Sequence, residues 1–279
     1  MKTLLKSLAL TTALLAALWA SLYPRPVLAE VLEIPGTGAC EVLLRELAQV
    51  YNQQHPGQKV VVPPSIGTAG AMRLITGDQA VLVRIARPLT EKEQGLGLTY
   101  LPFGHDPVVF AVGAKVPVRD LTVSQLVDIF TGKITSWKEL GGPPALIRLL
   151  IRQPGDSSLL IIQKHLEPFR DITFSPTAKI PYTDPDMLAA LQKYAFSIGW
   201  VTLSSLKGAE TPLYQLALDG IAPTLENIES HKYRLIEEYA LVFKEHHLNN
   251  LAKSFISFLF SQEGQKVMKQ LGAMPAGKR

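Results

Sequence analysis

The chain has 279 residues, a length that a single hydrophobic core seldom supports, so two lobes are expected. With 47% hydrophobic and 19% charged residues, the composition excludes intrinsic disorder and fibrous repeats. One cysteine excludes an intrachain disulfide framework and the cysteine-rich class of zinc and iron–sulfur sites.

The first 29 residues have the pattern of an export signal. Lys2 and Lys6 precede an apolar stretch from Leu8 to Trp19, and Val27–Ala29 forms a small-residue cleavage motif. The stretch is shorter than the roughly 20 residues of a membrane-spanning helix. We expect residues 1–29 to be a signal peptide and the protein to be periplasmic or otherwise extracytoplasmic, with an uncleaved membrane anchor as the alternative.

Removal of the leader also changes the charge. It takes away Lys2, Lys6 and Arg25 and no acidic residue, which brings the 28 basic residues of the whole chain close to its 24 acidic ones. A nearly neutral chain has no electrostatic footprint for nucleic acid, so we expect no nucleic-acid partner. Any bound anion has to be held by local geometry rather than by overall charge.

The rest of the chain alternates short apolar strands with amphipathic helices, the pattern of an α/β fold with parallel strands. In chain order, strands are expected over residues 31–34, 59–62, 81–85, 107–112, 147–151 and 197–203. Helices are expected over residues 43–51, 72–75, 123–130 and 159–165, with two more within 251–271. A capping box of Thr122 and Gln125 predicts the start of the third helix, and Gly132 predicts its end.

Two of these strands are expected to connect the lobes. The strand after Pro107 leaves the first lobe, and the strand that begins at Ser197 returns to it. We therefore predict a discontinuous lobe 1 of residues 30–107 and 203–279, a lobe 2 of residues 108–202, and a ligand cleft between them.

Three loops share one design, because each follows a strand, is rich in Gly, Ser or Thr, and opens a helix. They are Gly36–Cys40, Ser65–Gly70 and Gly155–Ser158. The first N–H groups of a helix lack partners within the helix, and the helix dipole adds partial positive charge there. Together the loops predict a site for a small oxyanion at the carboxyl ends of strands, although any one of them is also an ordinary turn before a helix.

Two arginines at strand ends add positive charge to this prediction. Arg152 directly precedes a helix-opening loop, so it is the stronger candidate for a ligand contact. Arg87 is either a ligand contact or a surface ion pair beside Pro88, and the sequence leaves both open.

Several segments resemble the periplasmic phosphate-binding proteins of ABC transporters. The resemblance covers nearly all of the chain after the leader, and its most specific part is Phe130–Trp137, followed at the family's spacing by the loop after Arg152. The other similar segments are Gly36–Gly38, Ser65–Gly70, Ala86–Leu89, Ile198–Trp200, Pro223–Ile228 and Ser261–Gln265.

The resemblance implies a two-lobed type II binding-protein fold that closes over phosphate or a related oxyanion and delivers it to ABC permease subunits. It implies no catalytic residue, no cofactor and no resident metal, and we expect a monomer. The residues expected to bind the ligand are Thr37, Ala39, Cys40, Ser65, Gly67, Thr68, Arg87, Arg152, Gly155, Asp156, Ser157 and Ser158.

The chain departs from the family pattern in its loops. Ala39 stands where the family usually has a hydroxyl, Ala86-Arg87 stands where many members have a serine or an aspartate, and the loop after Arg152 has Asp156 in place of a serine. A carboxylate at this position can accept the proton of monohydrogen phosphate and repel sulfate. Alternatively, Asp156 caps the following helix and pairs with Arg152.

Other functions remain as alternatives. The same fold can serve as an exported sensor or scaffold module without transport. A phosphate-ester hydrolase would need paired carboxylates, a metal cluster or a nucleophile with its base, none of which the spacing indicates. Cys40 as a nucleophile and Glu245–His247 as metal ligands are weaker interpretations than a buried small side chain and a solvated helix end.

Overall fold

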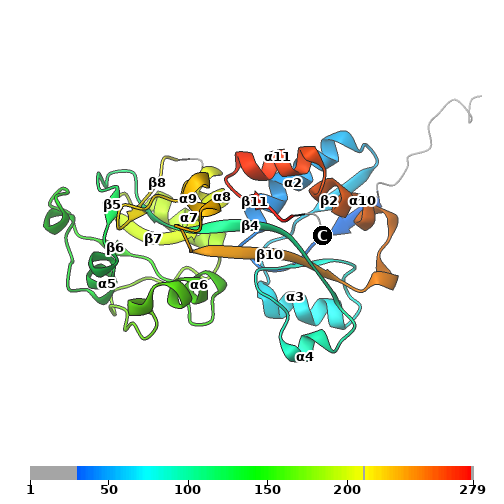
Figure 1. The fold of residues 1–279 in the computed structure, drawn as a ribbon, viewed down its shortest axis with the longest axis horizontal. Coiled ribbons are helices and arrows are strands. Elements are labelled where there is room, and N and C mark those ends of the chain that lie inside the picture. Colours follow the sequence, from blue (N-terminus) through cyan, green and yellow to red (C-terminus); the bar gives the residue numbers. More distant parts are fainter. Residues whose placement is uncertain (1–29, 210, 278–279) are drawn as a thin grey trace, which may run out of the picture.

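The computed structural model describes residues 30–209 and 211–277 and shows two α/β lobes side by side (Figure 1). The predicted signal peptide, residues 1–29, lies outside the described residues. Within the described part, no helix combines the length and the apolar character that crossing a bilayer requires.

The elements follow one another with short connections. The strands are β1 (Glu30–Glu33), β2 (Gln58–Val61), β3 (Val83–Ile85), β4 (Thr99–Val112), β5 (Asp120–Leu121), β6 (Arg148–Leu149), β7 (Ser197–Thr202), β8 (Tyr214–Gln215), β9 (Ala217–Leu218), β10 (Ile236–Phe243) and β11 (Met274–Pro275). The α-helices are α2 (Glu41–Gln54), α3 (Gly67–Thr76), α4 (Glu91–Gln94), α5 (Val123–Thr131), α6 (Ser157–His165), α7 (Asp184–Lys193), α8 (Leu203–Lys207), α9 (Leu225–Glu229), α10 (Asn250–Leu259) and α11 (Gln262–Gln270). Three 3-10 turns are η1 (Trp137–Leu140), η2 (Glu167–Phe169) and η3 (Glu245–His247).

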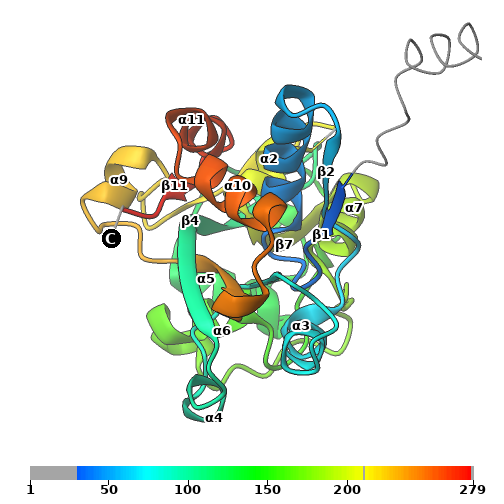
Figure 2. The same ribbon diagram turned by 90° about the vertical axis from the view of Figure 1, so that its right-hand side faces the viewer.

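Lobe 1 is built from both ends of the described chain. Its apolar core takes buried side chains from residues 32–103 and again from residues 239–273. Helices α2, α10 and α11 lie on one side of β4 and β10, and α3 and α4 lie on the other (Figures 1 and 2). Burial of the apolar faces of α2 and α10, including Leu43 and Phe255, holds the two ends of the chain together.

Lobe 2 has its own core, formed by buried side chains between Val108 and Leu235. Trp137 and Trp200, predicted to be core residues, are 0% and 1% exposed. Phe110 and Phe130, whose ring centroids are 5.9 Å apart, both pack against Trp200 in an aromatic cluster. The predicted capping box of α5 is confirmed, as is its left-handed end at Gly132, where φ is 84°.

The lobes are connected by β4 and β10, which pair antiparallel from Pro107 and Ile236 outward to Thr99 and Phe243. The expectation that the strand at Ser197 returns to lobe 1 is wrong. That strand, β7, pairs with residues 108–112 of β4 inside lobe 2, and the return is made by β10, which the sequence analysis missed. Residues 203–235 contribute to the lobe 2 core, so we propose that lobe 2 extends to residue 235.

The described strands form a mixed seven-stranded sheet and two separate two-stranded sheets, β1-β2 and β5-β9, rather than one parallel sheet. Parallel pairing occurs between β1 and β2, β5 and β9, and β6 and β7, as the strand–helix alternation predicts. Along the path β3-β10-β4-β7 the pairing is antiparallel, because β4 and β10 run between the lobes in opposite directions.

Candidate functional site

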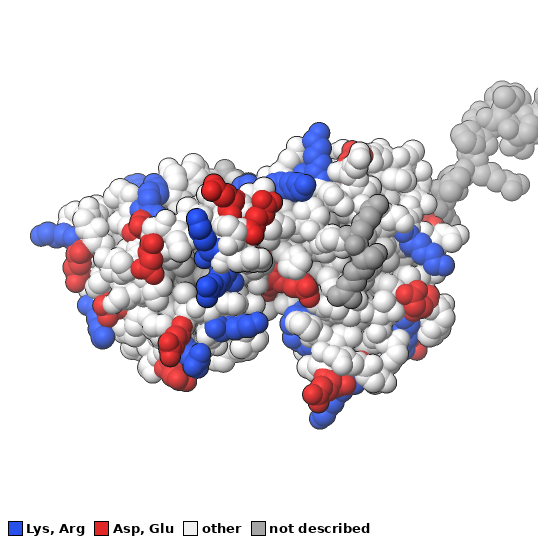
Figure 3. All heavy atoms as spheres, viewed as in Figure 1, with Lys and Arg blue, Asp and Glu red and all other residues white. Residues whose placement is uncertain are grey.

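A cavity of about 360 Å³ lies between the lobes, and both lobes line it. The surface is hollowed between the lobes at the lower edge of the view in Figure 3, where acidic and basic side chains are interspersed rather than gathered. Helices α3 and α6 stand on opposite sides of this gap (Figure 1). The predicted residues that line the cavity are Thr37, Ser65, Gly67, Thr68, Arg87, Arg152, Gly155, Asp156 and Ser157.

On the lobe 1 side, the cavity is bounded by the first turn of α3. Gly67, Thr68 and Ala69 line it, and no side chain caps this helix. Helix α2, which follows the Thr37 loop, also lacks a side-chain cap. The other α-helices of the described residues each begin with a side-chain cap. Of these two helices, α3 has its first turn at the cavity, whereas α2 begins after the Thr37–Gly38 segment that lines it. The Gly67 N–H donates to Ser65 Oγ at 3.3 Å, and the N–H groups that follow it in α3 are left to bind an anion.

Arg84 holds the lobe 1 loops in place from below. Its side chain is fully buried, with its Nε donating to the Thr37 carbonyl at 2.8 Å and its Nη2 to the Pro63 carbonyl at 2.9 Å. Nη1 donates to the carbonyl of Ile34, and Nη2 also pairs with Glu41 at 3.4 Å. Every nitrogen of the guanidinium therefore has a partner, and together they connect the segments that flank the loops Gly36–Cys40 and Ser65–Gly70.

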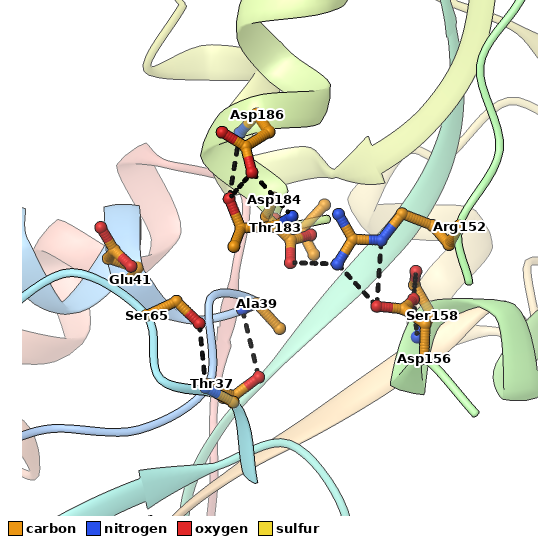
Figure 4. Close-up of polar contacts among 12 residues, drawn as sticks. Thr37, Ala39, Glu41, Ser65, Arg152, Asp156, Ser158, Thr183, Asp184 and Asp186 are labelled. Carbon is orange, nitrogen blue, oxygen red and sulfur yellow. Dashed lines mark hydrogen bonds and ion pairs between the residues drawn. The ribbon is translucent and has the colours of Figure 1, made fainter. Parts of the chain in front are cut away.

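On the lobe 2 side, Arg152 is the central charge (Figure 4). Its side chain is 4% exposed and donates to Asp156 Oδ2 from Nη2 at 2.6 Å and from Nε at 3.0 Å. Nη2 also lies 3.3 Å from Asp184 Oδ2. The third nitrogen, Nη1, is buried and has no hydrogen-bond partner among the described residues.

Asp156 is the N-cap of α6, as well as the partner of Arg152. Its Oδ1 accepts from the backbone N–H groups of Ser158 at 3.1 Å and Leu159 at 3.3 Å and from the Ser158 hydroxyl. Oδ2 accepts both donors of Arg152. Of the two roles considered for Asp156, this geometry is that of the helix cap.

Arg87 makes an ion pair, one of the two roles that the sequence left open, and it also lies at the cavity. It lines the cavity, and its two terminal nitrogens pair with the carboxylate of Glu93 at 2.7 and 2.8 Å. Hydrogen bonds from Arg87, together with those from the backbone and hydroxyl of Thr90, lower the pKa of Glu93 to about 2. The guanidinium is thus fixed at the rim of the cavity by a neighbour on its own lobe.

Three predicted residues do not line the cavity. Ala39 and Cys40 are 2% and 0% exposed and belong to the lobe 1 core, because α2 starts at Glu41 and turns both side chains under the loop. Ser158 is 3% exposed, with its hydroxyl bonded to Asp156 and to the indole N–H of Trp200 at 3.0 Å. The lining instead contains their sequence neighbours Gly38, which was not predicted, and Ser157, which was.

The sequence analysis missed the start of α7. Tyr182 and Thr183 line the cavity, and Asp184 reaches Arg152 behind it. A signal was present, because Thr183 and Asp186 form a capping box with Pro185 in the first turn. Arg84 was missed as well, although a charged residue within the apolar run Val83–Ile85 is itself unusual.

Buried acids gather where β4 and β10 cross between the lobes. Asp106 and Glu237 are paired residues of these strands and are both 0% exposed. Burial raises the pKa of Asp106 to about 7, and burial beside Asp184 raises the pKa of Glu237 well above its ordinary value. The pKa of Asp184 is raised to about 6, also by burial, against the opposing effect of Arg152. Three acidic groups, Asp156, Asp184 and Glu237, thus lie near the single guanidinium of Arg152, and burial disfavours ionisation of the last two.

The structure adds no support for Cys40 as a nucleophile or for Glu245–His247 as metal ligands. Burial raises the pKa of Cys40 to about 12, which disfavours a thiolate nucleophile. No group of three potential metal ligands occurs among the described residues, and His247 lies 3.4 Å from Asp78 beside Lys244.

Comparison with known families gives one match over most of the chain. The family model of the PBP superfamily domain matches residues 24–263. Two curated relatives are each named "Phosphate-binding protein PstS". The one from Borreliella burgdorferi is 23% identical over 249 residues, covering 87% of this chain and 89% of the relative. The one from Bacillus subtilis is 26% identical over 253 residues, covering 88% and 80%.

Solved structures share the fold. A putative phosphate ABC transporter substrate-binding protein from Clostridium perfringens, with bound phosphate, has a TM-score of 0.73 at 24% identity, covering 89% of this chain and all of that one. An ABC-type phosphate transport receptor from Vibrio cholerae has a TM-score of 0.61 at 25% identity, covering 87% and 99%. The predicted two-lobed type II α/β fold is confirmed.

Proposed function

This chain belongs to the PBP superfamily, and on that premise we propose that it captures phosphate in the cavity between its lobes and delivers it to an ABC transporter. The names of its curated relatives support phosphate as the ligand. The name of the Vibrio cholerae receptor supports the transporter as the partner.

The first turn of α3 is the observation that carries the proposal. It begins at the cavity without a side-chain cap, a property that it shares among the described α-helices with α2 alone. A tetrahedral anion bound there accepts from the free N–H groups, and the helix dipole favours its charge. The buried Nη1 of Arg152, which has no partner, provides an independent indication that this place is made for an anion.

The affinity expected from such a site is substantial. Each charge-assisted hydrogen bond contributes roughly 1.5–3 kcal/mol. Four to six of them, less the cost of desolvation, are enough for micromolar binding at about −8 kcal/mol. Binding without turnover follows, because the lining has no arrangement of nucleophile and base for attack on a bound anion.

We further propose that the protein acts as a monomer outside the cytoplasm, with residues 1–29 as the export signal. Two structural neighbours are named a putative phosphate ABC transporter substrate-binding protein and an ABC-type phosphate transport receptor, and these names support this compartment. The site residues proposed are those that line the cavity, with the Arg152 and α3 contacts as its centre.

Calorimetric titration of the purified, phosphate-stripped protein with inorganic phosphate tests the proposal. We expect a dissociation constant in the micromolar range or tighter. The Arg152→Met variant should bind at least about 100-fold more weakly, equivalent to about 2.7 kcal/mol. Arg148→Met is the matched control, because Arg148 precedes Arg152 in the same segment but is exposed and outside the cavity.

A second pair of variants covers the case in which Arg152→Met fails to fold. Thr68→Ala removes a hydroxyl from the first turn of α3 and should weaken binding by about threefold to tenfold. Thr76→Ala removes a hydroxyl at the other end of the same helix, where Oγ1 donates to the Met72 carbonyl, and should leave binding unchanged. Equal affinities in all variants, or no phosphate binding by the unaltered protein, would exclude the proposed function.

A further inference from the structure

The ionised carboxylates at and near the cavity already accept hydrogen bonds or ion pairs from other groups of the protein. Asp156 is the one carboxylate among the described residues that line the cavity, and five donors from Arg152, Ser158 and Leu159 meet its two oxygens. A carboxylate offers about four lone-pair positions. Asp156 therefore has no position left to accept a proton from a ligand.

The carboxylates just outside the lining are engaged too. Asp186 accepts from the N–H and the hydroxyl of Thr183. Glu93 holds Arg87 in a two-pronged ion pair. Asp184 is buried and lies against Arg152.

Glu237 is different, because neither of its oxygens makes a hydrogen bond of ordinary geometry. It is fully buried behind the cavity, facing Asp184, Asp156 and Asp106 and the hydroxyl of Ser157. These acids and its burial raise its pKa well above the ordinary value, which favours the neutral form. Glu237 is thus not a charged acceptor for a bound anion.

What remains in the lining are N–H groups, Arg87, the side-chain amide of Gln153 and hydroxyls such as that of Thr68. A hydroxyl can rotate, and an amide can turn over, to donate to a bare oxygen or to accept from a P–OH group, so both serve either kind of oxygen. An ionised carboxylate only accepts, which makes it favour a protonated oxyanion and repel an unprotonated one. The lining therefore contains donors for a dianion, but no free carboxylate that would favour a protonated oxyanion over an unprotonated one.

We propose that this cavity selects tetrahedral dianions by shape and donor placement alone, so that sulfate binds within about tenfold of monohydrogen phosphate. The inference rests on the proposed function and deepens it, because it widens the ligand class from phosphate to phosphate and sulfate. It replaces the hypothesis that Asp156 selects the protonated anion.

The test is a calorimetric titration of the purified protein with sodium phosphate and with sodium sulfate at mildly alkaline pH. Under these conditions inorganic phosphate is mainly the monohydrogen dianion and has the same charge as sulfate. Dissociation constants within about tenfold of each other support the inference. Binding of phosphate with sulfate more than about tenfold weaker overturns it while leaving the proposed function intact. Binding of neither anion excludes the proposed function itself.

Two variants test whether a carboxylate of the protein accepts the proton of bound phosphate. Asp156→Asn retains an oxygen for the N-cap of α6, and Asp184→Asn tests the buried acid beside Arg152. The sulfate-to-phosphate ratio of affinities should stay within about threefold of the unaltered protein in both, whatever happens to the affinities themselves. A ratio that moves toward sulfate in either variant identifies that carboxylate as an acceptor of the phosphate proton and contradicts the inference. Thermal unfolding of each variant shows that the ratio comes from folded protein.

Discussion

Each lobe has one buried arginine behind its wall of the cavity, and the two differ in what surrounds them. Arg84 of lobe 1 meets three backbone carbonyls and one carboxylate, Glu41, with all its nitrogens. Arg152 of lobe 2 meets two carboxylates, Asp156 and Asp184, and keeps Nη1 without a partner.

The difference separates two uses of the same buried cation. A guanidinium whose donors all go to the chain fixes loops and has nothing left for a ligand. A guanidinium with a spare buried donor keeps a capacity for an anion, at a cost in stability while that donor has no partner. Burial is common to both, so burial alone does not identify a binding arginine.

Among the predicted variants, replacement of Arg84 in lobe 1 should reduce the free energy of unfolding the most. Arg84→Met leaves the Glu41 carboxylate and the three carbonyls without this donor, and we expect a loss of about 3–5 kcal/mol in the free energy of unfolding. Arg45→Met is the control, since Arg45 pairs with the same Glu41 at 2.7 Å but is 48% exposed. That variant should lose less than about 1 kcal/mol in denaturant unfolding. Similar losses for both would show that Arg84 is not the central connection of these loops.

The excess of acid on the Arg152 side predicts that stability falls as the pH rises. Asp106 has a folded pKa of about 7 against an ordinary value of 3.8, so the folded state holds the proton that the unfolded state has lost between these values. The free energy of unfolding should therefore decrease from about pH 4 to about pH 7, by at most about 4 kcal/mol from this group. Asp106→Asn should flatten this part of the profile. A profile of the same slope in the variant would assign the dependence to other groups, such as Asp184.

The cap of α6 should make a smaller contribution. Asp156→Ala removes an N-cap and one of the two carboxylates of Arg152, and we expect a loss of about 2 kcal/mol in the free energy of unfolding. Asp156→Asn retains an acceptor for the cap and should lose less than half of that. If both variants lost the same amount, the ion pair with Arg152 rather than the cap would be the important interaction.

Replacement of Arg87 should have the smallest effect on stability and on phosphate affinity. This variant tests whether an arginine at the rim that is paired within its own lobe still takes part in binding. Arg87→Gln should weaken phosphate binding by about threefold to tenfold and change stability by less than about 1 kcal/mol. Glu93→Gln breaks the same ion pair but leaves the guanidinium, so its phosphate affinity should stay the same or increase. Equal weakening in the two variants would mean that the ion pair, and not the charge of Arg87, matters.

Much of the molecule could be predicted from local sequence. The helix-opening loops, the capping box of α5, the buried tryptophans and the two-lobed fold depend on residue types and spacings that neighbours along the chain specify. The position of Arg152 directly before such a loop also indicated its place at the cavity. These features are local because turns, caps and periodic apolar faces are decided within a few residues.

Only the tertiary structure decided which donors remain free. The return through β10 depends on pairing with β4 more than 120 positions earlier, as in Glu237 opposite Asp106. Asp184 meets Arg152 because α7 is packed against β7, next to the strand that leads to Arg152. Sequence shows which groups can donate or accept, but their partners come from distant segments. Whether Asp156 was a selective acceptor or a saturated cap could therefore be settled only once those partners were in place.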